Sequence, residues 1–128
     1  MSKRKELILH EDIEQGLLME WTELQQARYP ELALLFHIPN EAGTRTLKET
    51  LRLKGLGVKA GVPDLFLPVA RWGYHGLFIE MKRLKGGRVT EQQAEWHKQL
   101  QEQGYCVKVC KGFNEAKNML MIYLAGAK

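Results

Sequence analysis

The chain has 128 residues, enough for one domain with its own hydrophobic core, and we expect residues 1–128 to form a single domain. Apolar residues make up 45% and charged residues 27%, a globular composition that excludes a disordered chain. The net charge of +4 favours an anionic partner. No stretch has the length and apolarity of a signal peptide or a membrane span, so we expect a cytoplasmic protein without a membrane partner.

The predicted elements follow the chain in the order α-β-(α)-β-β-α-β-α. Helices are predicted over residues 11–28, 44–54, 90–103 and 113–124, and strands over 34–38, 64–67, 77–82 and 105–110. This order predicts an α/β domain with a mixed sheet flanked by helices. Cys106 and Cys110 fall in one predicted strand, roughly 13 Å apart, which is beyond disulfide reach and predicts two free thiols.

Two short motifs on neighbouring predicted strands indicate the chemistry. The first is Pro63-Asp64 and the second is Glu80-Met81-Lys82. Side chains alternate along a strand, so Glu80 and Lys82 share one face, and a hairpin would place Asp64 beside them. Two carboxylates that close repel each other unless a cation lies between them. Hard oxygen ligands suit Mg²⁺ or Mn²⁺, so we interpret this as the metal site of a nuclease, with Lys82 acting on the attacking water or the scissile phosphate.

A third carboxylate is predicted in the first helix. The apolar stripe of that helix comprises Ile13, Leu17, Leu18, Trp21 and Leu24. At about 100° per residue, Glu14 lies about 40° from the centre of the stripe. A carboxylate within a buried stripe requires a cation or a donor, so Glu14 is a candidate site residue, with snorkelling or a helix-start role as the alternative.

Gln93 has two interpretations. It shares a helical stripe with Trp96, His97 and Leu100, but Thr90 and Gln93 also have the spacing of a capping box. The residues alone favour the cap. The four histidines, His10, His37, His75 and His97, lack zinc-ligand spacing and are interpreted as surface or satisfied residues, with His37 a weak candidate near the site.

Basic residues lie on both sides of the acidic motifs. The candidates for phosphate binding are Arg45, Lys54, Lys59, Lys85 and Arg88. Solvated helix and turn surface is the alternative for about half of such charges. The apolar run of the last helix, 119–124, fits a dimer contact or plain core packing equally well.

These motifs resemble the PD-(D/E)XK nuclease superfamily, and more narrowly its VRR-NUC family. The matching blocks are residues 59–67 around Pro63-Asp64, residues 78–82 around Glu80-Met81-Lys82, and residues 87–96 with Gln93 and Trp96. The resemblance implies a restriction-endonuclease-like α-β-β-β-α-β core. It implies metal binding by Asp64, Glu80 and the Met81 carbonyl, with Lys82 catalytic, and it favours Glu14 and Gln93 as site residues.

The resemblance is to compact stand-alone members from bacteria and phages. It implies a Mg²⁺- or Mn²⁺-dependent endonuclease that cuts branched DNA such as four-way junctions, as a homodimer and without a small-molecule cofactor. Two alternatives remain. One is a catalytically idle nucleic-acid-binding subunit, which the intact motifs disfavour. The other is a sequence-specific restriction enzyme, for which no recognition insertion is visible.

Overall fold

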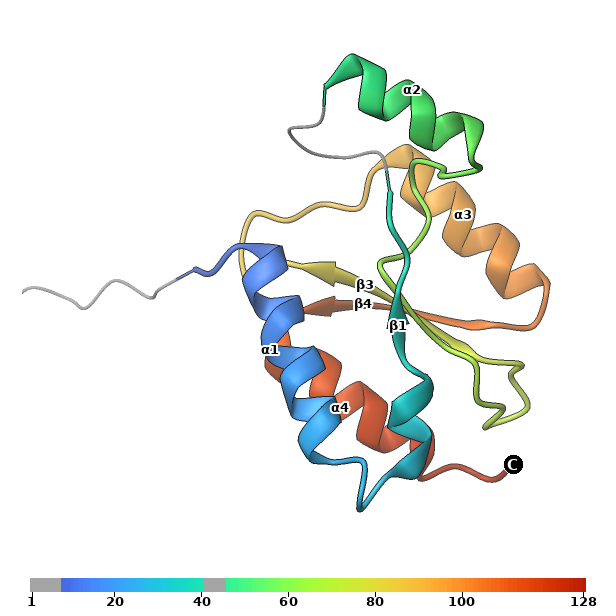
Figure 1. Cartoon of the computed structure of the whole chain (residues 1–128). Coiled ribbons are helices and arrows are strands. Elements are labelled where there is room, and N and C mark those ends of the chain that lie inside the picture. Colours follow the sequence, from blue (N-terminus) through green and yellow to red (C-terminus); the bar gives the residue numbers. More distant parts are fainter. Residues whose placement is uncertain (1–7, 41–45) are drawn as a thin grey trace, which may run out of the picture.

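A computed structural model describes residues 8–40 and 46–128, and within them four strands form one sheet in the order β1-β2-β3-β4 (Figure 1). β2 is antiparallel to β1 and to β3, whereas β4 is parallel to β3. The elements in chain order are α1 (Glu11–Leu24), the 3-10 helix η1 (Pro30–Leu34), β1 (Phe36–His37), α2 (Leu47–Gly55), β2 (Leu65–Leu67), β3 (Leu77–Lys82), α3 (Glu91–Glu102), β4 (Cys106–Lys111) and α4 (Gly112–Leu124). The predicted mixed sheet with its α-β-β-β-α-β core is confirmed.

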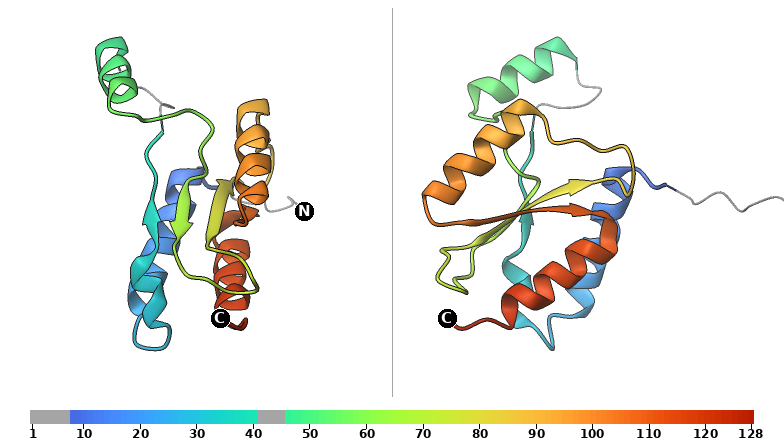
Figure 2. Two further views of the ribbon diagram at one scale, coloured as in Figure 1. Left: turned by 90° about the vertical axis from the view of Figure 1, so that its right-hand side faces the viewer. Right: turned by 180° about the vertical axis from the view of Figure 1, so that it is seen from behind.

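Helices cover the two faces of the sheet unequally. α1 and α4 pack on one face, and α3 lies on the other face along β3 and β4 (Figures 1 and 2). Every residue of β3 is buried, as the continuous apolar start of the strand predicts. Its odd-numbered residues point to the α1–α4 side and belong to the hydrophobic core: Leu77, Ile79 and Met81. Its even-numbered residues, which include Glu80 and Lys82, therefore face α3.

The buried face of α1 differs from the predicted stripe. Ile13, Leu17 and Leu24 are 53%, 41% and 80% exposed. Leu18 is buried as predicted, and Trp21 is partly buried against the core. The buried residues of α1 are Glu14, Leu18 and Thr22, which repeat every four positions along one side of the helix. α1 packs against both the sheet and α4, and this double contact selects the buried side. Glu14 is therefore within the buried face, but the face is centred elsewhere than the sequence indicated.

Two predicted boundaries near the first strand are wrong. The first helix ends at Leu24 rather than near residue 28, and residues 25–28 form a turn in which the Tyr29 amide donates to the Gln25 carbonyl over 2.7 Å. The predicted strand over 34–38 is shortened to Phe36–His37, because η1 begins at Pro30 and takes up Leu34. Proline at the first position of a helix has a favourable φ and lacks only an amide that would have no partner there.

α2 stands apart from the rest of the fold (Figures 1 and 2). Thr46 caps its N-terminus by accepting from the Glu49 amide, and none of its residues is buried.

The last helix, α4, is packed into the fold, since Leu120 and Tyr123 are fully buried and only Ile122 of its apolar run is strongly exposed, at 58%. The run 119–124 thus packs mainly as core. Cys106 and Cys110 are free, as predicted.

Candidate active site

Asp64 immediately precedes β2 and joins three strands. The register that pairs Leu65 with Ile79 brings Asp64 alongside Glu80. The Met81 amide donates to Asp64 Oδ2 over 2.7 Å, and the Ile38 amide donates to the Asp64 carbonyl over 2.7 Å. His37 Nδ1 lies 2.9 Å from the same carbonyl oxygen. The side chain of Asp64 is thus fixed in position by the backbone of β3, at the point where the β2–β3 ladder ends.

Glu80 is a carboxylate in a nearly dry position, 2% exposed. Burial, and next the hydrogen bond and negative charge of Asp64, raise the pKa of Glu80 to about 9, while the Lys82 ammonium opposes the rise. Without a cation, Glu80 is therefore protonated at neutral pH. A divalent cation offers the same relief from repulsion and brings more charge. The fold thus brings Asp64 and Glu80 together, as the sequence predicted.

Lys82 and Gln93 are joined, and Gln93 satisfies both of its interpretations. Lys82 is 6% exposed, and its ammonium donates to Gln93 Oε1 over 2.9 Å. The same oxygen accepts the Thr90 amide over 2.9 Å, and Thr90 Oγ1 accepts the Gln93 amide over 3.1 Å, which completes a capping box. The cap therefore holds Gln93 in the rotamer that positions the Lys82 ammonium next to Glu80.

His97 belongs to this cluster, and its interpretation as a surface or satisfied residue missed that. Its Nε2 lies 3.4 Å from Glu80 Oε1. Burial, followed by the positive charge of Lys82, lowers the pKa of His97, so the ring is neutral at pH 7 and can donate Nε2–H to the carboxyl group of Glu80. The signal was present in the sequence, because His97 follows Gln93 by four residues, and residues i and i+4 of a helix share a face.

Two carboxylates of α1, the predicted site residue Glu14 and also Glu11, have different surroundings. Glu14 is 5% exposed, and its Oε2 accepts the Phe113 amide at the start of α4 over 2.7 Å. Glu11 is the α1 carboxylate whose charge adds to the rise in the pKa of Glu80, and it lies 4.0 Å from Arg83 Nε. Within residues 8–40 and 46–128, no cluster of three or more His, Cys, Asp or Glu side chains has the geometry of a metal site. A metal-binding role for Glu14 stays a prediction.

The other predicted site residues lie around this cluster. Met81 is 1% exposed, with its amide directed to Asp64. Lys54, Lys59, Lys85 and Arg88 are exposed, as phosphate-binding residues would be, and Arg45 lies outside the described residues. No helix in the described part of the chain has the length and apolarity needed to cross a bilayer.

Comparison with protein families matches the VRR-NUC domain to residues 6–114 of this chain. A solved structure described as a VRR_NUC domain protein is 33% identical in sequence and superposes with a TM-score of 0.79. That superposition covers 94% of this chain and 92% of the other. No curated protein matches the chain.

Proposed function

The chain belongs to the VRR-NUC domain family, which is nuclease-like and processes DNA, and from this premise we propose that it is a Mg²⁺- or Mn²⁺-dependent endonuclease that cuts branched DNA. The observation that supports the proposal best is the pair formed by the half-buried Asp64 and the buried Glu80, with the buried Lys82 beside it. Two carboxyl groups and one ammonium, largely shielded from solvent at Glu80 and Lys82, fit the binding of a divalent cation and a phosphodiester.

The donor set fits a hard divalent cation. The carboxyl groups of Asp64 and Glu80 would hold it together with the Met81 carbonyl, and Glu14 is proposed as a further ligand because only its Oε2 is bonded to Phe113. When bound, the cation supplies Lewis-acid polarisation of the phosphate and lowers the pKa of a water ligand. The Glu80 proton must leave when the cation binds, so affinity for the metal should increase with pH.

The residues around the carboxylates have separate tasks in this proposal. The Lys82 ammonium, held by Gln93, stabilises the negative charge that grows on the scissile phosphate and orients the attacking water. His97 fixes Glu80 through its ring nitrogen. The exposed Lys54, Lys59, Lys85 and Arg88 hold neighbouring phosphates without reading sequence. None of these groups needs a small-molecule cofactor.

Cleavage of a four-way junction requires two nicks on opposing strands, and a two-fold homodimer supplies two active sites in a fixed relation. We therefore propose a homodimer. The support is the likeness to compact stand-alone family members, because the apolar run of α4 is mainly core and offers only Ile122 as a strongly exposed contact.

The test is to incubate the protein with labelled four-way junction, flap and plain duplex DNA, with Mn²⁺ or with EDTA. We expect cleavage of branched DNA in Mn²⁺ and none in EDTA, together with a dimeric mass by light scattering at micromolar concentration. Binding of all three DNAs without cleavage under any metal would identify an idle binding subunit instead. A monomeric mass with single nicks on a cruciform plasmid would rule out junction resolution.

A further inference from the structure

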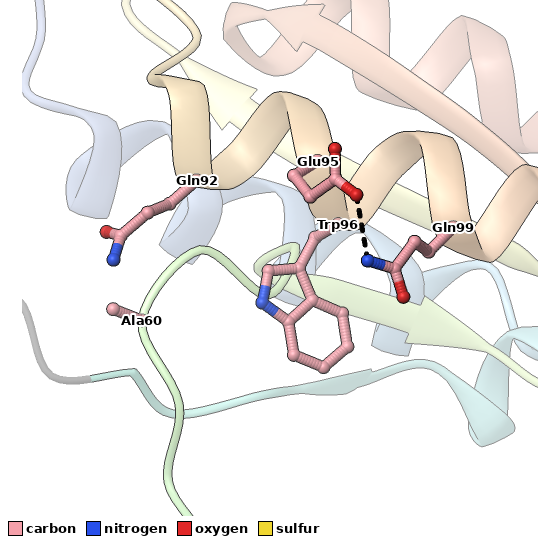
Figure 3. Close-up of a pocket in the computed structure, with 5 residues that line it drawn as sticks. All are labelled: Ala60, Gln92, Glu95, Trp96 and Gln99. Carbon is pink, nitrogen blue, oxygen red and sulfur yellow. Dashed lines mark hydrogen bonds between the residues drawn. The ribbon is translucent and has the colours of Figure 1, made fainter.

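A recess beside Trp96 lies next to the active site but does not belong to it. It has a volume of about 300 Å³ and is lined by Ala60, Gln92, Glu95, Trp96 and Gln99. Figure 3 shows the indole projecting from α3 toward the loop that carries Ala60, between Gln92 on one side and the pair of Glu95 and Gln99 on the other. Gln92, Trp96 and Gln99 are spaced i, i+4 and i+7, so they share one side of α3. Gln93 and His97 form the adjacent side, which contacts Lys82 and Glu80.

The loop holds the indole in place by close contact. Gly61 has a φ of +92°, and a Cβ there would lie 2.9 Å from Trp96 Cδ1 and 3.0 Å from the Gln92 carbonyl carbon. A side chain at this position would be strained and would push the loop away from α3. The close contact fixes one edge of the ring and leaves the recess open beside it, so the aromatic surface is organised before any ligand arrives.

The polar groups of the recess select the kind of ligand. Gln99 Nε2 donates to Glu95 Oε1 over 2.9 Å, which leaves Gln99 Oε1 and the second Glu95 oxygen as acceptors. Among residues 8–40 and 46–128, no Lys or Arg lines the recess, and the Glu95 charge repels phosphate. An aromatic wall with acceptor oxygens suits a flat, uncharged ring that offers N–H groups. Adenine, cytosine and guanine carry an exocyclic amino group with two N–H donors, whereas an unpaired thymine offers only its single ring N3–H.

We propose that this recess holds an unpaired nucleobase that bears an exocyclic amino group, from a nucleotide close to the scissile phosphate. The inference rests on the proposed function, and it narrows the proposed substrate from branched DNA to DNA with an unpaired base near the cleaved bond. Stacking on Trp96 provides affinity for any base, and the acceptors of Gln99, Glu95 and Gln92 distinguish amino-bearing bases from thymine. Only a base outside the duplex stack can enter, so branched or flapped DNA is favoured over plain duplex.

The experiment measures binding by fluorescence anisotropy in EDTA, so that no cleavage is needed. The probes are matched flap DNAs with a single unpaired dC, dA or dT at the branch, and a fully paired duplex. The variant is Gln92→Leu/Gln99→Leu, and the control is Gln101→Leu, an exposed glutamine about 200° around α3 from Gln99. We expect the double variant to bind the dC and dA flaps about tenfold more weakly, while its affinity for the dT flap and the duplex stays unchanged.

Equal weakening on all four DNAs, or no weakening on any, would overturn the proposal. Thermal unfolding of the double variant checks its fold, and Trp96→Phe, which keeps a ring, provides a second variant that should retain most of the dC affinity. Failure of the proposed function has a separate signature. If the wild-type protein discriminates dC from dT in EDTA but cuts no DNA in Mn²⁺, the recess stands and the nuclease proposal falls.

Discussion

The two faces of β3 are both buried, yet one lies in an apolar environment and the other in a polar one. On the α1–α4 face, Ile79 and Met81 are 0% and 1% exposed and lie among other apolar side chains. On the α3 face, Glu80 and Lys82 are 2% and 6% exposed and lie among carboxyl, imidazole and amide groups. Neighbouring residues of one strand thus have nearly equal burial, but their side chains lie in opposite environments, one apolar and one polar.

This difference shows that the burial of a residue does not by itself tell whether the residue stabilises the fold. The apolar face lowers the free energy of folding through burial of apolar area. The polar face carries the desolvation of a carboxylate, whose pKa is raised to about 9, and this opposes folding at neutral and higher pH. Such a cost is retained where chemistry requires the groups. Substitutions on the two faces should therefore separate activity from stability.

The largest effect is expected from Asp64→Ala and Glu80→Ala. Either change removes one of the two carboxyl groups proposed to hold the metal, and we expect single-turnover cleavage to fall by at least about 10³-fold. DNA affinity in EDTA should stay the same or increase, because a negative charge is removed. Glu20→Ala, at an exposed position of α1, is the control. Wild-type cleavage by Asp64→Ala would refute the site.

Lys82→Ala should lower the cleavage rate by roughly 10²-fold, comparable to the loss of one preorganised electrostatic group. Gln93→Ala should have a smaller effect on the rate, because Gln93 acts on the substrate through Lys82, and should also destabilise α3 by about 1 kcal/mol through loss of its cap. Single-turnover kinetics measures the effect of Gln93→Ala on the cleavage rate, and thermal unfolding measures its effect on stability. A greater rate loss in Gln93→Ala than in Lys82→Ala would contradict this order.

Ile79→Ala is the matched change on the apolar face. It should lower the free energy of unfolding by about 2–5 kcal/mol, whereas cleavage measured well below the melting temperature should change by less than about threefold. Denaturant unfolding and single-turnover cleavage provide the two readings. Cleavage as poor as that of Glu80→Ala, in protein shown to be folded, would remove the distinction between the faces.

Glu80 should make metal-free stability dependent on pH. The pKa of Glu80 in the folded protein, about 9, lies above its ordinary value of 4.5. The contribution of Glu80 to the free energy of unfolding is therefore fully present below about pH 4.5 and is lost as the pH rises toward about 9. In EDTA, the melting temperature of the wild type should fall over this range relative to Glu80→Gln. Mn²⁺ should reverse the fall at the alkaline end. Parallel curves for the two proteins would show that Glu80 is ionised in the fold.

The smallest effects should come from α1. Calorimetry of Mn²⁺ binding to Glu14→Gln should show about tenfold weaker affinity if Glu14 completes the ligand set, as we propose. Glu11→Gln should weaken binding by about threefold, because Glu11 acts on Glu80 through charge alone. Glu23→Gln, at an exposed position, is the control. Unchanged affinity in Glu14→Gln would limit that carboxylate to its bond with Phe113.

The amino-acid sequence by itself determined the order of elements and the pairing of Asp64 with Glu80. Both follow from short-range rules, since apolar runs and turn residues delimit the strands, and a period of two assigns Glu80 and Lys82 to one face. The capping box at Thr90 and Gln93 was also readable, because it depends on four consecutive residues.

Only the tertiary structure decided which contacts several of these side chains make. Helix spacing places His97 on the same side as Gln93, but its approach to Glu80, 17 residues away in sequence, depends on how α3 packs on the sheet. Glu14 meets the amide of Phe113, 99 residues away, and no local spacing encodes that contact. The rotation of α1 that buries Glu14 and exposes Ile13 arises from its packing on β3 and α4 together. Helix periodicity defines which side chains share a face, but the neighbouring elements select the face that is buried. That selection is a property of the packed molecule.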